Sequence, residues 1–362
     1  MHGKGALAAL AVVISLALPA TAGADYPVPW TGDFSQQARD PNSPPAGAND
    51  WECEPGDAHP DPVILVHGTF ANRTVNWPTL SPFLANRGYC VFALTFGRRP
   101  QVDFGFYRPG GLDRMQQSAR RLAGFASRVM RKTGSERVDV VGHSQGALMP
   151  NWWVKRLGGD AVVDDYVGIS PLWDGTNLAG IATLDELGAQ YGASEGFYEL
   201  FEPYCPACRQ LFSSSGFIRR MNGGGGPRVH GVDYTMILTR NDQLVVPYTS
   251  GLMDGARNVV VQDACPLDQS DHLAIIFDPI TAYTILNALD ERRTRVLQPL
   301  QGLIDLGGGN AGQLGHLVAV GRRLLQQRAV GTGLVLGEPE RLELPDELVE
   351  TSHVASLTAL PG

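Results

Sequence analysis

The segment Gly142-His143-Ser144-Gln145-Gly146 has the pattern G-x-S-x-G, in which a serine lies between two glycines. Three valines within 138–141 precede it and indicate a buried strand, while apolar residues recur at helical spacing over 147–157. The chain must turn sharply between such a strand and helix, and a side chain at either glycine would collide there. This turn would expose Ser144 for attack on an electrophile.

A serine hydroxyl is a weak nucleophile at neutral pH, so it needs a histidine that takes its proton and a carboxylate that orients the histidine. Four histidines follow Ser144, at positions 230, 272, 316 and 353. His230 has no obvious strand-end acid before it, and the last two histidines lie in the C-terminal tail. We therefore predict His272, just beyond the last expected strand, as the general base.

Three aspartates are candidates for the carboxylate that orients His272. Asp242 directly follows the expected strand 234–239, and functional groups in parallel α/β sheets collect at the carboxyl ends of strands. Asp263 at the end of the next expected strand is the alternative, while Asp271 is too close in sequence to His272 to orient its ring. We predict Asp242 as the acid.

The oxyanion that forms during attack needs hydrogen-bond donors that are fixed before the reaction. We expect one donor to be the backbone N–H of Gln145 and the other to be Thr69, through its N–H and its hydroxyl. Thr69 lies in His67-Gly68-Thr69-Phe70, directly after the first expected strand, where His67 would shape the loop. His143 would pack beside the turn, because the residue before the nucleophile points away from it. This chemistry requires no metal and no organic cofactor.

The pattern along the chain predicts one α/β domain. Apolar runs typical of strands occur at 63–66, 89–96, 138–141, 166–169, 234–239 and 259–262, and helical stretches at about 80–87 and 112–132. Strands that alternate with helices form a parallel sheet with right-handed crossovers. The alternation breaks at about 171–230, which we interpret as an insertion over the sheet. Its apolar residues would form an acyl pocket or lid, or alternatively the core of a small helical cap.

Both ends of the chain differ from this domain in composition. Residues 1–24 contain a short apolar run followed by small residues, which predicts a cleaved signal peptide and a secreted protein; no longer apolar run predicts a transmembrane segment. We assign 25–297 to the catalytic domain and 298–362 to a C-terminal tail that is partly helical or disordered. The formal net charge of −8, without a basic stripe, argues against nucleic acid as a partner.

Secretion would place the five cysteines in an oxidising compartment, where disulfides persist. We predict a bridge between Cys53, just before the first strand, and Cys90, at the start of the next. Cys265 would pair with Cys205 or Cys208. The sequence does not choose between these two, and a bridge between Cys205 and Cys208 stays open.

Four segments carry a family resemblance: the His-Gly-Thr loop, the Ser144 turn, Thr239-Arg240-Asn241-Asp242, and Cys265-Pro266-Leu267 before Asp271-His272. Through these segments the chain resembles secreted bacterial triacylglycerol lipases of class 2 and, more distantly, fungal lipase B. The resemblance spans roughly 25–290. It implies an α/β-hydrolase fold, the triad named above, and a lipid or small ester as substrate, which a lipase would meet at a lipid–water interface. The alternatives are a short-chain esterase, a polyester depolymerase, an acyltransferase, or a binding protein without catalysis.

Overall fold

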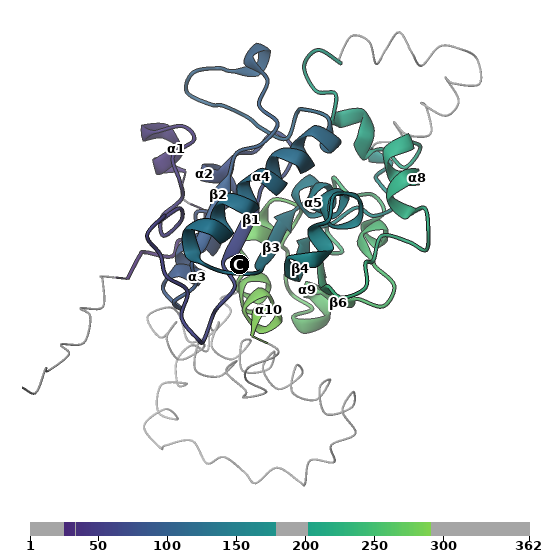
Figure 1. The fold of residues 1–362 in the computed structure, drawn as a ribbon. Coiled ribbons are helices and arrows are strands. Elements are labelled where there is room, and N and C mark those ends of the chain that lie inside the picture. The colour runs from purple at the N-terminus through teal and green to yellow at the C-terminus, as the bar shows by residue number, and fades with distance from the viewer. Residues whose placement is uncertain (1–24, 33, 179–201, 291–362) are drawn as a thin grey trace, which may run out of the picture. The chain divides into compact units, whose positions relative to one another are not determined.

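A computed structural model describes residues 25–32, 34–178 and 202–290 of the chain (Figure 1). The chain divides into two units after Val296, and all described residues belong to the first unit. The expected signal peptide, residues 179–201 of the expected insertion and the C-terminal tail lie outside the described residues. Within the described part, none of the helices has the length and apolar character that a membrane crossing needs.

The described residues form a six-stranded sheet in which every neighbouring pair is parallel, with the order β2-β1-β3-β4-β5-β6. This confirms the expected α/β fold. The strands are β1 (Val63–Val66), β2 (Val91–Leu94), β3 (Val138–His143), β4 (Val163–Ile169), β5 (Asp233–Leu238) and β6 (Arg257–Val260). All residues of β1, β2 and β3 are buried, because helices cover both faces of the sheet.

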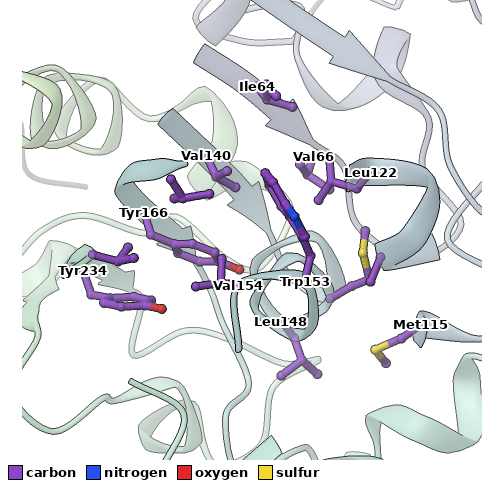
Figure 2. Close-up of a cluster of buried hydrophobic side chains, with 14 of the residues drawn as sticks. Ile64, Val66, Met115, Leu122, Val140, Leu148, Trp153, Val154, Tyr166 and Tyr234 are labelled. Atoms are coloured by element: carbon purple, nitrogen blue, oxygen red, sulfur yellow. The ribbon is translucent and has the colours of Figure 1, made fainter. Parts of the chain in front are cut away.

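One face of the sheet is covered by α4 (Met115–Thr133), α5 (Gln145–Arg156) and α8 (Gly216–Asn222). Figure 2 shows this interface, where Leu122 of α4 and Trp153 of α5 lie among strand residues such as Val140 and Tyr166. The opposite face packs against α3 (Leu80–Ala85), α9 (Val261–Ala264) and α10 (Pro279–Leu289). The two apolar layers hold the strand ends, and the loops that follow them, in a fixed arrangement.

Short helices occupy several connections between these elements. They are α1 (Ser35–Arg39), α2 (Arg73–Asn76) and the 3-10 helices η1 (Pro100–Val102), η2 (Gly159–Ala161), η4 (Cys208–Leu211), η5 (Tyr248–Gly251) and η6 (Ala274–Phe277). Four of them, α1, α2, η4 and η6, contain residues that line the candidate site described below.

The last strand begins and ends two residues earlier than the sequence predicts. The expected strand 259–262 ends at Val260, and α9 begins at Val261. The reason lies in the neighbouring strand: Leu238 ends β5 and pairs with Val260, so no partner remains for further residues of β6. The prediction that Asp263 follows a strand end was therefore wrong, because this residue lies on a helix.

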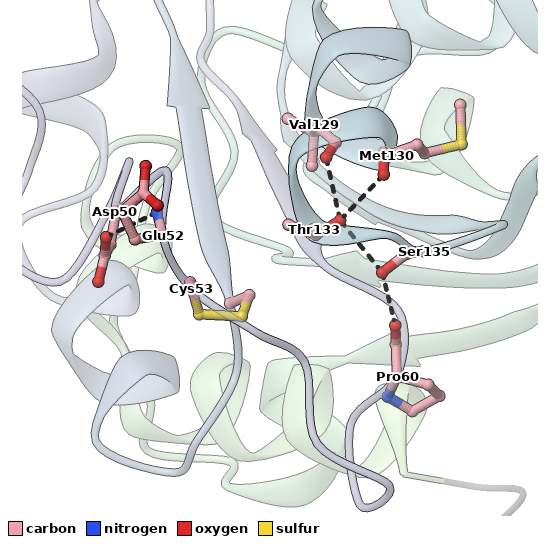
Figure 3. The surroundings of a disulfide bond; sticks show 9 residues. Asp50, Glu52, Cys53, Pro60, Val129, Met130, Thr133 and Ser135 are labelled. Carbon is pink, nitrogen blue, oxygen red and sulfur yellow. Dashed lines mark hydrogen bonds between the residues drawn. A yellow bond between two sulfur atoms is a disulfide. The ribbon is translucent and has the colours of Figure 1, made fainter.

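The disulfide pattern confirms one prediction and corrects another. Cys53 and Cys90 are bridged, and Figure 3 shows this bond with Asp50 and Glu52 just before Cys53. The pairing of Cys265 was predicted wrongly: Cys205 bonds to Cys208, and Cys265 is a free thiol. The start of η4 brings the Cα atoms of Cys205 and Cys208 to 5.4 Å, which is within bridging distance and leaves neither sulfur for Cys265.

Candidate active site

Ser144 lies at the tip of the tight turn between β3 and α5. Its backbone has φ 56° and ψ −122°, a conformation that non-glycine residues rarely adopt. A Cβ atom on Gly142 would lie 1.9 Å from the carbonyl oxygen of Gly146, and one on Gly146 would lie 2.1 Å from that of Val66. These distances confirm the prediction that side chains at the two glycines would collide.

The structure brings His272 and Asp242 together, as the sequence predicts. His272 Nδ1 lies 2.9 Å from Oδ1 and 2.8 Å from Oδ2 of Asp242, and the two side chains are only 3% and 2% exposed. A carboxylate at Nδ1 fixes the tautomer in which this nitrogen carries the proton and Nε2 is free to accept one. The pair therefore has the orientation that a general base requires.

The carboxylate of Asp242 is held in its ionised form. Burial raises the pKa of Asp242, but the hydrogen bond with His272 and the backbone N–H of Val245 outweigh burial and leave this pKa below its ordinary value. Oδ1 also accepts the N–H groups of Leu244 and Val245 at 3.0 and 2.7 Å. The carboxylate is thus a negatively charged acceptor whose position is fixed by backbone N–H groups of its own loop.

The loops that carry Asp242 and His272 are tied to each other. A parallel β-bridge joins Asn241 to Asp271, and Gln243 Oε1 accepts the backbone N–H of His272 at 3.3 Å. Asp271 itself caps the next turn, because its Oδ1 accepts the N–H groups of the two residues after His272. The sequence did not indicate Gln243, whose role depends on the contact between two separate loops.

The other candidate residues lie away from this pair. Asp263 is exposed and forms an ion pair with Arg240, so it does not orient His272. His230 is exposed in the loop before β5. The remaining two histidines, at 316 and 353, lie outside the described residues.

Ser144 and His272 line one cavity of about 980 Å³. Most of its other lining residues are apolar: Phe34, Phe70, Val75, Phe106, Leu172, Leu178, Leu211, Phe212, Leu244, Val245, Leu273, Ile276 and Phe277. Within the expected insertion, Leu172 and Leu178 line the cavity, whereas Trp173 is buried in the main apolar core beside the sheet. Residues 179–201 lie outside the described part.

The two residues expected to bind an oxyanion lie side by side. The hydroxyl of Thr69 donates to Oε1 of Gln145 at 2.7 Å. Gln145 is the first residue of α5, and N–H groups in the first turn of a helix have no partner within the helix. The positive end of the helix dipole at this point favours negative charge.

His143 packs beside the turn, as predicted, but it also makes a contact that the sequence did not indicate. Its Nε2 lies 2.9 Å from the carbonyl oxygen of His272, and its Nδ1 lies 3.2 Å from Oδ1 of Asn76. The same Asn76 oxygen accepts the N–H of Gly68 at 3.1 Å. Burial lowers the pKa of His143 to about 3, so the ring is neutral near pH 7. Asn76 lies far from the motif in sequence, and no spacing signal points to it.

His67 shapes the loop that carries Thr69, which confirms its predicted role. The ring stacks on Phe96, Nδ1–H donates to the carbonyl of Gly68 at 2.7 Å, and Nε2 accepts the N–H of Phe96 at 3.2 Å. Both nitrogens of a neutral imidazole thus have a hydrogen-bond partner, and burial lowers the pKa of His67 to about 4.

Among the described residues, Asp61, Asp139 and Asp164 are the only group of three side chains close enough to hold a metal ion. Asp164 pairs with Arg137, which already supplies positive charge there. None of these residues lines the cavity at Ser144.

The chain matches the family model described as Lipase (class 2) over residues 60–284. Among solved structures, lipase B of Aspergillus fumigatus is similar with a TM-score of 0.53 and 21% identity, over 77% of this chain and 65% of that chain. The chain thus spans less than two thirds of the fungal lipase, whose likeness shows the α/β-hydrolase fold. A mature Bacillus licheniformis lipase has a TM-score of 0.47 and 14% identity, over 68% of this chain and 96% of that chain.

Proposed function

Because the chain belongs to the class 2 lipase family and is a carboxylic ester hydrolase, we propose that it is a secreted triacylglycerol lipase that acts through an acyl-enzyme on Ser144. One observation carries this proposal: both carboxylate oxygens of Asp242 hold His272 at the wall of the same apolar cavity that Ser144 lines. This cavity fits a fatty acyl chain, since its walls offer few polar partners.

In the proposed reaction, Ser144 Oγ attacks the ester carbonyl while Nε2 of His272 takes its proton. Asp242 stabilises the imidazolium that forms. The N–H groups of Thr69 and Gln145 bind the oxyanion, and His272 then gives the proton to the departing alcohol. A water molecule, activated in the same way, releases the fatty acid from Ser144.

Secretion is part of the proposal. The apolar run in residues 1–24 is followed by small residues, and disulfides such as Cys53–Cys90 persist in oxidising compartments. Mature protein from the culture medium should have an intact mass that corresponds to a start near Asp25. A secreted protein that keeps residues 1–24 would contradict a cleaved signal.

A substrate series on the mature protein tests the lipase proposal against a short-chain esterase. Hydrolysis rates should be measured for esters from acetyl to stearoyl, below and above the concentration at which each forms an emulsion, with Ser144→Ala as control. A lipase should prefer long chains and gain activity above that concentration. Maximal activity on soluble short esters would favour an esterase, and an alcohol that outcompetes water would favour an acyltransferase.

A further inference from the structure

The side chain of Gln145 is fully buried beside the proposed oxyanion site, yet within the described part of the chain only one end of its amide has a hydrogen-bond partner. Oε1 accepts the hydroxyl of Thr69 at 2.7 Å, whereas Nε2 is buried and has no hydrogen-bond partner among the residues that the structure describes. A buried donor without an acceptor costs about 1 to 3 kcal/mol. The observed orientation of the amide is therefore held at one end only.

This orientation directs the only hydroxyl proton of Thr69 away from a substrate. A threonine hydroxyl has one proton to donate, and here it is donated to Oε1 of Gln145. Gly111 lies close to both residues, because a Cβ atom added to it would lie 2.7 Å from Gln145 Oε1 and 3.0 Å from Thr69 Cα. Rotation of the Gln145 amide alone would reverse the direction of the hydrogen bond within this contact.

We propose that the Gln145 amide turns end for end when the oxyanion forms, so that Nε2 donates to Thr69 Oγ1 and the Thr69 hydroxyl donates to the oxyanion. This inference rests on the proposed function, because it takes Thr69 to face the reacting carbonyl. The oxygen and nitrogen ends of an amide have nearly the same size, so the turn needs no backbone movement. It also gives Nε2 the acceptor that it lacks.

The new hydrogen bond would strengthen the hydroxyl as a donor, because donors in a chain of hydrogen bonds polarise one another. The Gln145 side chain is then a positioning residue that acts through Thr69, in addition to its own backbone N–H. Its effect belongs to the transition state, so substitutions of this side chain should lower kcat and leave KM nearly unchanged.

Substitutions that allow only one direction of the hydrogen bond test this proposal. In Gln145→Glu the carboxylate can only accept, which keeps the Thr69 hydroxyl turned away, and in Thr69→Val the hydroxyl is lost. Loss of one oxyanion donor costs about a hundredfold in kcat. Each single variant should lose about this factor, and the double variant should lose no more than either. Gln101→Glu adds the same charge at an exposed position in η1 and should stay within about twofold of wild type.

A second pair of variants keeps the test decisive if Gln145→Glu does not fold. In the Gln145→Met background the hydroxyl is no longer positioned, so Thr69→Val should cost about tenfold less there than in wild type. Three results would overturn the inference. The kcat losses of Gln145→Glu and Thr69→Val could multiply in their double variant, Thr69→Val could lower kcat equally in the wild-type and Gln145→Met backgrounds, or Thr69→Val could leave kcat unchanged. In each of these cases a serine-directed phosphonate would still label Ser144, whereas failure of the proposed function would abolish labelling of wild type.

Discussion

Replacing Asp242 by asparagine should disable the base while leaving the fold intact. Oδ1 of Asp242 accepts two backbone N–H groups, so the oxygen of asparagine would keep that place and its NH₂ group would take the place of Oδ2, which lies 2.8 Å from His272 Nδ1. The retained oxygen lies 2.9 Å from Nδ1 but already accepts two N–H groups, so the NH₂ group favours the tautomer in which Nδ1 accepts and Nε2 carries the proton. In that tautomer His272 has no lone pair for the proton of Ser144.

The expected loss follows from this change of tautomer. The equivalent carboxylate-to-amide change in a serine protease triad lowers kcat about 10⁴-fold, which corresponds to about 5 kcal/mol of transition-state stabilisation. We expect a loss of this order in Asp242→Asn, with KM changed little, because the carboxylate acts only when the imidazolium forms. The assay is steady-state hydrolysis of a soluble p-nitrophenyl ester at pH 7 to 8, with thermal unfolding as the check on folding.

Asp263→Asn is the matched control, because Asp263 was the rival acid in the sequence and is exposed beside Arg240. This variant should keep kcat within about twofold of wild type, since exposed ion pairs contribute little. If Asp242→Asn kept a tenth or more of wild-type activity while Asp263→Asn lost most of it, the assignment of the acid would be refuted.

Three further predictions concern the surroundings of the site. His143→Phe removes the hydrogen bond to the carbonyl of His272 and should lower kcat about fivefold at constant KM, the equivalent of about 1 kcal/mol; unchanged kcat would contradict this role. Wild type should lose stability in urea as pH falls from 6.5 toward 4, because unfolded His67 binds a proton that the buried ring, with a pKa of about 4, does not. His67→Gln should reduce the change in the free energy of unfolding with pH by up to about 1.4 kcal/mol per pH unit. The same pH dependence in both proteins would contradict the burial of a neutral His67. Gly146→Ala should destabilise the protein by about 3 kcal/mol or prevent folding, whereas Gly124→Ala in the open face of α4 should stabilise it by about 0.5 to 1 kcal/mol; similar unfolding curves would refute the steric reasoning.

The sequence predicted most of the sheet because its strands are buried on both faces and therefore appear as continuous apolar runs. It placed Ser144 correctly in a tight turn, since the turn depends on glycines that are adjacent in sequence. Asp242 and His272 were found through the rule that loops after parallel strands meet at one edge of the sheet. These predictions all depend on local patterns and on the order of elements along the chain.

The remaining features depend on contacts that local patterns do not encode. The end of β6 is set by the length of its neighbour, β5, so the expected strand extended too far and Asp263 was misplaced. The free thiol of Cys265 follows from the bridge between Cys205 and Cys208, one of several pairings that the sequence allowed. Asn76 is joined to His143 only by the packing of separate loops.

Trapping the acyl-enzyme tests the central claim most directly. The mature enzyme should be mixed with excess p-nitrophenyl ester, quenched in acid within the first turnover, and analysed by intact mass and peptide mapping. We predict one acyl group per protein on the peptide that contains Ser144, and neither acyl group nor turnover in Ser144→Ala. An acyl group on another residue, or full turnover by Ser144→Ala, would contradict the account.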